Sequence, residues 1–382
     1  MSDTRNPFLY GRPVEHQEEL INRAVEKADL IDCVRTGQPV MIYGPRRYGK
    51  TSLARVVAKE AANVWGIPSV YVDFWGVTSI ADVVNVLGRS YARVSNVFRM
   101  RRFLADHLGS IGFRVNLGDG FSVSYGGRVT GEEERAALRS LLEVPQRLAS
   151  RTSGGRVLLI FDEFGEILNV PGEPDALMRS AFQNSPDVSF LFMGSKRSLM
   201  DGLFSDRKRP FYNFGRRMEL GGLPHELLGD FIEERFEASD RRITEEAVDV
   251  LLDQVRGHPH RSQQLAFHAF RLARSGGVAD EETILAAREE ALKEAEPEFR
   301  AILDEMSASR RAVLVAFCRE PTDQPYSREY MQRHGIKGSG ALGSALEALM
   351  ASGHLERRVS KGQPVPTDPL FAFWIRERTN NS

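Results

Sequence analysis

The segment from Val40 to about Trp65 constrains the fold of this chain more than any other. Four apolar residues are followed by the loop Gly44-Pro45-Arg46-Arg47-Tyr48-Gly49-Lys50-Thr51, and apolar positions at helical spacing then run to about Trp65. The loop matches the pattern G-x-x-x-x-G-K-[ST], which occurs once, and it lies between an apolar strand and a helix as a true phosphate loop does. The sequence therefore predicts an α/β fold built around a phosphate-binding loop.

Further apolar segments predict the rest of a parallel sheet. Most of their residues are apolar and helical patterns separate them from one another, which is typical of strands covered by helices on both faces. A helix is also predicted before the first strand, over residues 14–36, because apolar residues from Leu20 to Ile31 recur at helical spacing. The predicted strands after residues 40–43 cover residues 69–74, 157–161, 189–193 and 217–220.

Residues 89–135 form a predicted insertion between the second and third strands. Its first half, Arg89 to Leu108, is expected to be a basic helix. Its second half alternates apolar and polar residues over 113–117 and 121–125 around Gly118-Asp119-Gly120, which predicts a hairpin. The arginines of the predicted helix are Arg89, Arg93, Arg99, Arg101 and Arg102.

The phosphate loop predicts both a ligand and the residues that hold it. Glycines let backbone N–H groups turn toward phosphate oxygens, and the following helix adds the positive end of its dipole. We expect residues Gly44 to Ser52 to bind ATP, with Lys50 reaching the β- and γ-phosphates and Thr51 holding Mg²⁺ through its hydroxyl. A glycine-lysine turn that binds nothing is the ordinary alternative.

Two carboxylates supply the second half of the predicted site. Asp162 and Glu163 directly follow the apolar run Val157 to Phe161, so they are expected at the carboxyl end of a central strand, beside the phosphate loop. Asp162 is placed to coordinate Mg²⁺, directly or through water. Glu163 is placed to polarise an attacking water as a general base. An acidic pair after a strand is common, but its combination with the phosphate loop predicts catalysis.

Other polar residues near the strand ends have two interpretations each. Ser195, which ends the fourth strand, can touch the γ-phosphate or the water, or it can be an ordinary strand-end serine. One of Arg209, Arg216 and Arg217 can act as an arginine finger on a neighbouring subunit's nucleotide, because a guanidinium stabilises charge on the transferred phosphoryl group. A solvated surface role is the alternative for each arginine.

The second half of the chain is predicted to be helical and to end in a small DNA-reading module. Amphipathic segments cover residues 226–237, 244–255, 261–274 and 280–295. The block from about 299 to 382 then predicts three short helices, over 309–319, 327–334 and 338–352, followed by a hairpin. That order is typical of a winged helix-turn-helix. We therefore divide the chain into a phosphate-loop core (1–224), a helical lid (225–298) and a winged-helix domain (299–382).

The predicted DNA contacts are weakly basic. The third short helix offers Lys337 and Ser339 near its start, with no arginine for guanine edges, and the hairpin can contact phosphates. Winged helices also bind proteins, so an unidentified protein partner is the alternative to DNA. The hairpin residues expected on DNA are Arg357, Arg358 and Lys361.

Composition excludes several classes of function. The formal net charge of -1 gives the chain no overall attraction to nucleic acid or anionic membrane, so such contacts must be local. Cys33 and Cys318 lack metal-ligand spacing and are expected to be reduced thiols. No apolar run approaches the roughly 18 residues needed to cross a bilayer, and residues 1–7 lack the apolar core of a signal peptide. We expect a cytoplasmic protein without membrane contact.

The motifs together resemble the archaeal-type ATPases of the STAND and AAA+ assemblage, which are relatives of the origin-recognition ATPases. The resemblance covers nearly the whole chain, least clearly the 97–135 insertion. It rests on the phosphate loop and on these segments: Asn6 to Arg12, Phe161-Asp162-Glu163-Phe164, Met193-Gly194-Ser195, Phe211 to Arg216, Gly257-His258-Pro259 and Asp368 to Trp374.

The resemblance implies further site residues. It implies that Phe8 and Arg12 belong to a box that packs on the adenine, and that Arg216 is the best candidate of the three arginines for the arginine finger. It implies that Pro259 of the lid contacts the nucleotide, as in signalling members of the group, whereas origin-recognition relatives use a lid arginine, for which Arg261 is the candidate. Ser195 stands where many such enzymes have asparagine or threonine, so binding is expected more firmly than fast hydrolysis.

These inferences predict an ATP-dependent switch. In it, ATP or ADP in the site controls self-assembly into a homo-oligomer and the engagement of DNA. The alternative is a signalling scaffold that hydrolyses ATP slowly and binds a protein through the winged-helix domain. A small-molecule kinase is disfavoured, because the lid and the winged-helix domain would have no role in it.

Overall fold

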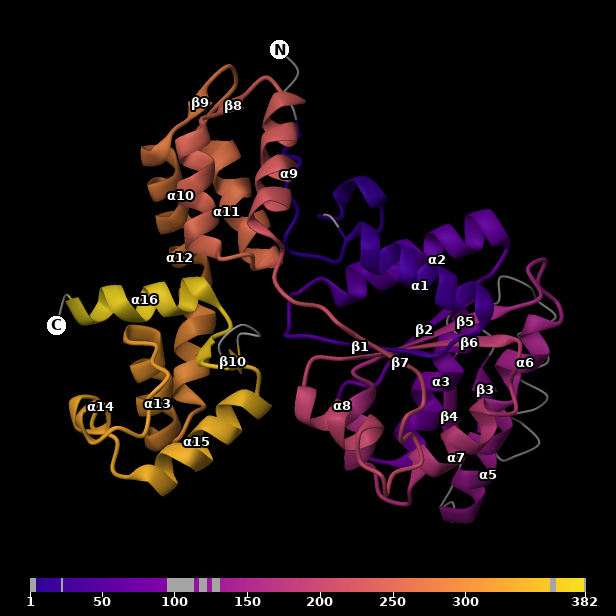
Figure 1. Ribbon diagram of the computed structural model, residues 1–382. Coiled ribbons are helices and arrows are strands. Elements are labelled where there is room, and N and C mark those ends of the chain that lie inside the picture. The colour runs from indigo at the N-terminus through magenta and orange to yellow at the C-terminus, as the bar shows by residue number, and fades with distance from the viewer. Residues whose placement is uncertain are drawn as a thin grey trace. The chain divides into compact units, whose positions relative to one another are not determined.

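The computed structural model describes residues 5–21, 23–94, 113–116, 122–125, 131–357 and 362–380 (Figure 1). The chain folds into two compact units. The first, here the sheet unit, comprises Arg23–Gly44 and Lys50–Glu219. The second, here the helical unit, comprises Met1–Asn22, Pro45–Gly49 and Leu220–Ser382. The tip of the phosphate loop therefore packs with the helical unit, although both flanks of the loop belong to the sheet unit.

The sheet unit is built on a five-stranded parallel sheet in the order β2-β5-β6-β1-β7. All five predicted strands are confirmed. The interior strands β5 and β6 are buried along their whole length, which explains why their sequences are mostly apolar. The strands are β1 (Val40–Tyr43), β2 (Ser69–Asp73), β5 (Val157–Asp162), β6 (Val188–Gly194) and β7 (Arg216–Glu219).

Helices cover both faces of this sheet, as predicted. Figure 1 shows α1 and α2 on one face and α3, α5 and α7 on the other. Phenylalanine rings fill much of the core, with Phe161, Phe164 and Phe192 in mutual contact. The elements of this unit are α1 (Ala24–Thr36), α2 (Lys50–Trp65), α3 (Ile80–Val94), α5 (Gly131–Leu142), α6 (Val144–Ala149), the 3₁₀ helix η2 (Phe164–Asn169), α7 (Pro174–Phe182) and α8 (Arg197–Phe204).

The predicted helix over residues 14–36 is wrong in its first half. A short 3₁₀ helix, η1 (Gln17–Glu19), is followed by extended backbone at Leu20, and α1 begins only at Ala24. Ile21 is buried in the core of the helical unit, whereas Leu30 and Ile31 are buried on α1 of the sheet unit. The helical spacing therefore continues across two groups of apolar residues that are buried in different units. The backbone between them is not helical, because tertiary burial outweighs local helix propensity.

Part of the predicted insertion lies within the described residues. Strands β3 (Phe113–Asn116) and β4 (Ser122–Tyr125) pair antiparallel, with Phe113 opposite Tyr125, and confirm the hairpin. Of the predicted basic helix, residues 89–94 form the end of α3. Arg99, Arg101 and Arg102 lie outside the described residues.

The four predicted helices after residue 224 are confirmed and form what we call the lid. They enclose an apolar core of their own, which also takes in Phe8 from the N-terminal segment. Two short strands, β8 (Arg242–Ile243) and β9 (Val278–Ala279), pair parallel at one end of the lid. The helices are α9 (His225–Glu237), α10 (Glu245–Val255), α11 (Pro259–Leu272) and α12 (Glu281–Asp304).

The remaining elements, α13 to α16, form what we call the C-terminal block. Three helices and an antiparallel hairpin follow one another in the predicted order. Helix α12 runs through the predicted boundary at residue 298. The centroid of its Phe299 ring lies 5.6 Å from that of Trp374 of α16, so the lid and the block share a core. The elements are α13 (Ala308–Arg319), α14 (Arg328–Arg333), α15 (Ser339–Ala351), β10 (Leu355–Arg357), β11 (Pro364–Pro366) and α16 (Pro369–Asn380).

None of the described helices combines the length and the apolar composition that a bilayer span requires.

Candidate phosphate-binding site

The phosphate loop contains two left-handed backbone positions, as an anion-binding nest requires. Arg47 and Gly49 both have left-handed backbones, with φ of 67° and 86°, and α2 begins directly afterwards at Lys50. Left-handed residues within such a turn make a concave nest of N–H groups that binds anions. The buried Lys50 folds back over the loop, and its Nζ donates to the carbonyl of Gly44 at 2.7 Å. The ammonium is thus held at the first residue of the loop.

Asp162 and Thr51 meet at the carboxyl end of β5. Asp162 is buried, and its Oδ2 accepts a hydrogen bond from Thr51 Oγ1 at 3.1 Å, while its Oδ1 accepts one from the backbone N–H of Glu163 at 3.0 Å. A hydroxyl and a carboxylate at this distance offer two hard oxygen ligands on one side of the loop. Mg²⁺ favours such sites, with one or two protein oxygens completed by phosphates and water. The residues therefore fit the magnesium ion that the sequence predicts.

Glu163 turns sharply away from the strand. Its backbone is left-handed, with φ of 48°, an uncommon conformation for a residue with a side chain and one that is enriched at functional sites. Its Oε2 accepts a hydrogen bond from the backbone N–H of Ser195 at 3.1 Å. The hydroxyl of Ser195 is buried and has no hydrogen-bond partner among the described residues. This orphaned hydroxyl beside Glu163 suits a water or phosphate oxygen.

Two residues of β2, which the sequence did not single out, lie beside the same carboxylates. The hydroxyl of Tyr71 donates to Asp162 Oδ2, and burial together with the Asp162 charge raises the pKa of Tyr71, which keeps the phenol protonated. Asp73 lies opposite Asp162 in the register of β2 and β5. Burial and the charges of Asp162 and Glu163 raise the pKa of Asp73. Only knowledge that β2 lies next to β5 would have revealed these residues.

The tip of the phosphate loop contacts the lid and the C-terminal block within the helical unit. The Tyr48 ring is buried with its centroid 4.9 Å from that of His258, and its hydroxyl donates to Glu356 of β10 at 3.2 Å. Arg47 pairs with Glu298 of α12 at 2.9 Å. Three separate elements beyond residue 220 thus hold the loop tip.

The solved structures that this chain resembles share its architecture. A Walker-type ATPase of Pyrococcus abyssi matches with a TM-score of 0.68 and 17% identity over 96% of this chain and 98% of that chain. The ORC2 protein of Aeropyrum pernix, in ADPNP and ADP complexes, matches with a TM-score of 0.58 and 16% identity over 99% of this chain and 97% of that chain. The ORC1 protein of the same organism, in complex with DNA, matches with a TM-score of 0.50 and 16% identity over 94% of this chain and 93% of that chain. The chain has the fold of these archaeal proteins.

The match confirms, at the level of the fold, the predicted phosphate-loop α/β class and the resemblance to origin-recognition ATPases. No family model matches the sequence, and no curated protein matches it. Because the identities lie below a fifth, the roles of individual residues must come from this structure.

The lid motif Gly257-His258-Pro259 makes a tight helix entry. Gly257 has φ of 76°, and a Cβ there would lie 2.5 Å from the carbonyl oxygen of Leu223, so only glycine fits. His258 caps α11 by accepting from the N–H of Arg261 through Nδ1 at 3.3 Å, and Pro259 is the first helical residue. The nucleotide contact expected of Pro259 stays a prediction.

Arg261, the alternative lid sensor, lies inside the protein. It is 1% exposed, and its guanidinium forms a bidentate ion pair with Asp368 at the start of α16 and donates to Gln264 at 2.6 Å. Burial tends to raise the pKa of Asp368, but the Arg261 charge outweighs it, so the pKa lies below its usual value. In this conformation Arg261 joins the lid to the C-terminal block.

The pH dependence of stability follows from the buried histidines of this motif. Burial lowers the pKa of His258 to about 4 and that of His260 to about 3, with Arg261 and Arg47 adding repulsion and Asp368 opposing it. These histidines therefore become protonated near pH 6.5 in the unfolded chain but stay neutral in the folded chain. The free energy of unfolding falls as the pH drops from 6.5 toward 4, by about 1.4 kcal/mol per pH unit for each histidine.

We expect His258→Asn, which keeps a capping side chain and cannot titrate, to reduce this slope by about 1.4 kcal/mol per pH unit. Urea unfolding at pH 7.5, 6 and 5 measures it. A variant whose slope equals that of the wild type would show that His258 does not cause the acid sensitivity.

Phe8 and Arg216, two further predicted residues, have partners within their own units. Phe8 is fully buried among Phe231, Phe236 and Phe270, so in this conformation its ring belongs to the lid core; the adenine contact expected of Phe8 and the exposed Arg12 stays a prediction. Arg216 begins β7 opposite Val40, at the amino end of the parallel sheet, and pairs with Asp29 at 2.7 Å.

The arginine-finger role of Arg216 toward a neighbouring subunit stays a prediction. Its two alternatives have partners within the sheet unit: Arg209 pairs with Asp175 at 3.5 Å, and Arg217 donates to the carbonyl of Phe204 at 2.8 Å. Of the predicted DNA contacts, Lys337, Ser339 and Arg357 are exposed, whereas Arg358 and Lys361 lie outside the described residues.

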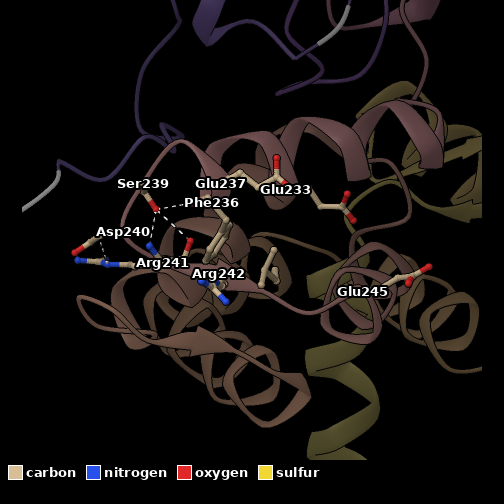
Figure 2. A pocket seen from close by; sticks show the side chains of 9 residues that line it. Glu233, Phe236, Glu237, Ser239, Asp240, Arg241, Arg242 and Glu245 are labelled. Carbon is tan, nitrogen blue, oxygen red and sulfur yellow. Dashed lines mark hydrogen bonds and ion pairs between the residues drawn. The ribbon is translucent and has the colours of Figure 1, made fainter.

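A hollow of about 710 Å³ at one end of the lid contains none of the predicted site residues (Figure 2). Two of its polar side chains already serve the fold: Ser239 Oγ donates to the carbonyl of Phe236 at 2.7 Å, and the Arg241 guanidinium lies 4.1 Å from the centroid of the Phe270 ring. We assign it no ligand. Its lining residues are Glu233, Phe236, Glu237, Ser239, Asp240, Arg241, Arg242, Ile243 and Glu245.

Proposed function

We propose that this protein binds ATP with Mg²⁺ and hydrolyses it to ADP and phosphate. The observation that carries the proposal is the hydrogen bond of Thr51, in the first turn of the helix that follows the phosphate loop, to Asp162, which also accepts from the N–H of Glu163. The fold shared with a Walker-type ATPase and with a protein solved with ADPNP and ADP supports the choice of ligand.

Each residue has a role that its surroundings support. The loop nest and Lys50 bind the phosphates, and Thr51 and Asp162 hold Mg²⁺, which when bound neutralises phosphate charge. Glu163 accepts a proton from the attacking water as general base, while the Ser195 hydroxyl hydrogen-bonds to that water or to the γ-phosphate. The bond from Lys50 Nζ to the Gly44 carbonyl is one that a phosphate oxygen would replace.

The contacts of the loop tip support a switch in addition to hydrolysis. Tyr48 and Arg47 are held by His258, Glu298 and Glu356, so a ligand that reshapes the loop must also change the environment of the lid and of β10. By linkage, the state of the C-terminal block would in turn alter nucleotide affinity. The proposed switch therefore operates through the block.

The partners of the switch are proposals as well. The element order of the block supports a winged helix, and exposed Lys337 and Arg357 support phosphate contact, so DNA is the favoured partner. The ORC1 neighbour was solved in complex with DNA. A slow-turnover scaffold that binds a protein through the same block is the alternative, and nucleotide-dependent self-assembly through Arg216 is part of the leading proposal.

Hydrogen exchange with and without Mg²⁺ and a slowly hydrolysed ATP analogue tests both the ligand and the switch. We expect the wild type to bind the analogue and to show altered exchange in β10–β11 and at the start of α11. Lys50→Ala, which removes the phosphate-binding charge, should lose about tenfold or more in affinity and show no change in exchange.

Three results would contradict parts of this proposal. Equal affinity in Lys50→Ala would remove the phosphate loop as the site. Binding to the wild type without any change in the exchange of β10–β11 would rule out the switch but leave the ATPase. Absence of binding to a DNA duplex at low salt in the ATP-analogue form, measured by fluorescence anisotropy, would favour the protein-binding scaffold.

A further inference from the structure

Tyr71 is a side chain beside Asp162 whose presence neither the motif nor the proposed mechanism explains. It lies on β2, half-buried, and its hydroxyl donates to Oδ2 of Asp162. The guanidinium of Arg55, on α2, lies 5.8 Å from the centroid of its ring. The ring is therefore placed between the sheet and the helix that starts at Lys50, with its only polar atom aimed at the carboxylate.

Hydrogen bonds from three different parts of the sheet unit fix the Asp162 carboxylate. The N–H of Glu163 donates to Oδ1 at 3.0 Å, Thr51 of α2 donates to Oδ2 at 3.1 Å, and Tyr71 of β2 donates to the same Oδ2. Hydrogen bonds to a carboxylate are about twice as strong as neutral ones. Without Tyr71, Oδ2 would be held by Thr51 alone, which must also offer its oxygen to the metal.

We propose that Tyr71 is a positioning residue for Mg²⁺ binding. Its hydroxyl holds Asp162 Oδ2 in the orientation that the ion requires. This inference rests on the proposed binding of Mg²⁺ with ATP. Residues that hydrogen-bond to metal ligands fix ligand orientation, and their loss typically lowers metal affinity 10- to 100-fold. Tyr71 acts through Asp162 and touches neither the nucleotide nor the reacting atoms.

A purely structural role for Tyr71 makes a different prediction. If the phenol only stabilises the packing of α2 on β2, its removal would lower stability and leave the metal dependence unchanged. Tyr43 supplies a matched control for this alternative. It lies on β1 of the same sheet and its hydroxyl also donates to a carboxylate, that of Glu219 at 2.8 Å, but it makes no bond to Asp162.

The experiment compares wild type, Tyr71→Phe and Tyr43→Phe in the full chain. Binding of a fluorescent ATP analogue is measured first in EDTA and then during a Mg²⁺ titration, so no turnover is needed. We expect Tyr71→Phe to keep the metal-free affinity within about twofold and to raise the Mg²⁺ concentration at half-effect by about tenfold. Tyr43→Phe should match the wild type in both measurements. Thermal unfolding of all three proteins accompanies the titrations.

Each result decides the matter. An unchanged Mg²⁺ midpoint in Tyr71→Phe would overturn the inference, and so would a tighter one, which would mean that the phenol competes with the ion for Oδ2. An equal loss of affinity with and without metal, together with a lower melting temperature, would assign Tyr71 a structural role. If the wild type itself bound no analogue, or bound it without regard to Mg²⁺, the proposed function would fail, and this is visible before any variant is compared.

Discussion

Glu163→Gln is expected to lower ATP turnover by about 10²- to 10⁴-fold while leaving ATP affinity nearly unchanged. The amide keeps the size of the side chain and can still accept the hydrogen bond that the Ser195 N–H donates to Oε2 at 3.1 Å. What it loses is the ability to take a proton from water. Because that ability matters only during the reaction, kcat should fall and binding should persist. Steady-state phosphate release and equilibrium binding of ATP measure the two quantities.

A nearby carboxylate provides the control for this substitution. Glu166 lies three residues further along, in η2, but it pairs with Lys196 at 2.7 Å and accepts from Asn169 at 2.8 Å, so it is occupied within the fold. We expect Glu166→Gln to keep most of its turnover. Turnover in Glu163→Gln equal to that of the wild type would remove Glu163 as the general base and direct attention to Asp73, the other carboxylate beside Asp162.

The sequence predicted the sheet and the centre of the site because both depend on local signals. Buried parallel strands are apolar along their whole length, and the phosphate loop and Asp162-Glu163 each follow such a strand directly. The carboxyl ends of neighbouring parallel strands lie at one edge, so the meeting of Thr51 with Asp162 followed from the pattern.

Residues whose roles depend on pairing over long distances could not be predicted. Tyr71 reaches Asp162 only because β2 lies next to β5, and no spacing in the sequence encodes the strand order β2-β5-β6-β1-β7. Ile21 has the same helical spacing as the residues of α1 but is buried in the other unit. Spacing describes how a segment presents its side chains, and it does not identify the surface that will cover them.

The ion pair between Arg261 and Asp368 is another case of this kind, because its partners are 107 residues apart. The Arg261 guanidinium is 1% exposed and is held by the carboxylate of Asp368 and the amide of Gln264. We expect Asp368→Ala to lower the free energy of unfolding by about 3 to 5 kcal/mol, because it leaves a buried cation without its counterion. Urea unfolding followed by circular dichroism measures the loss.

Asp368 also accepts from the N–H groups of Leu370 and Phe371 at the start of α16, so the loss of a helix cap must be separated from the loss of the ion pair. Asp280 makes the separation possible. It caps α12 in the same unit by accepting from Thr283 N–H at 2.9 Å, and Asp280→Ala should cost clearly less. Replacing both partners, as in Arg261→Met with Asp368→Asn, should recover part of the stability lost in Asp368→Ala, because no buried charge then remains unpaired.

Equal losses in Asp368→Ala and Asp280→Ala would show that the cap alone matters and that Arg261 is free to leave Asp368. In that case Arg261 would again be a candidate for sensing nucleotide, and the link between lid and C-terminal block would have to rest on α12 and the contact of Phe299 with Trp374.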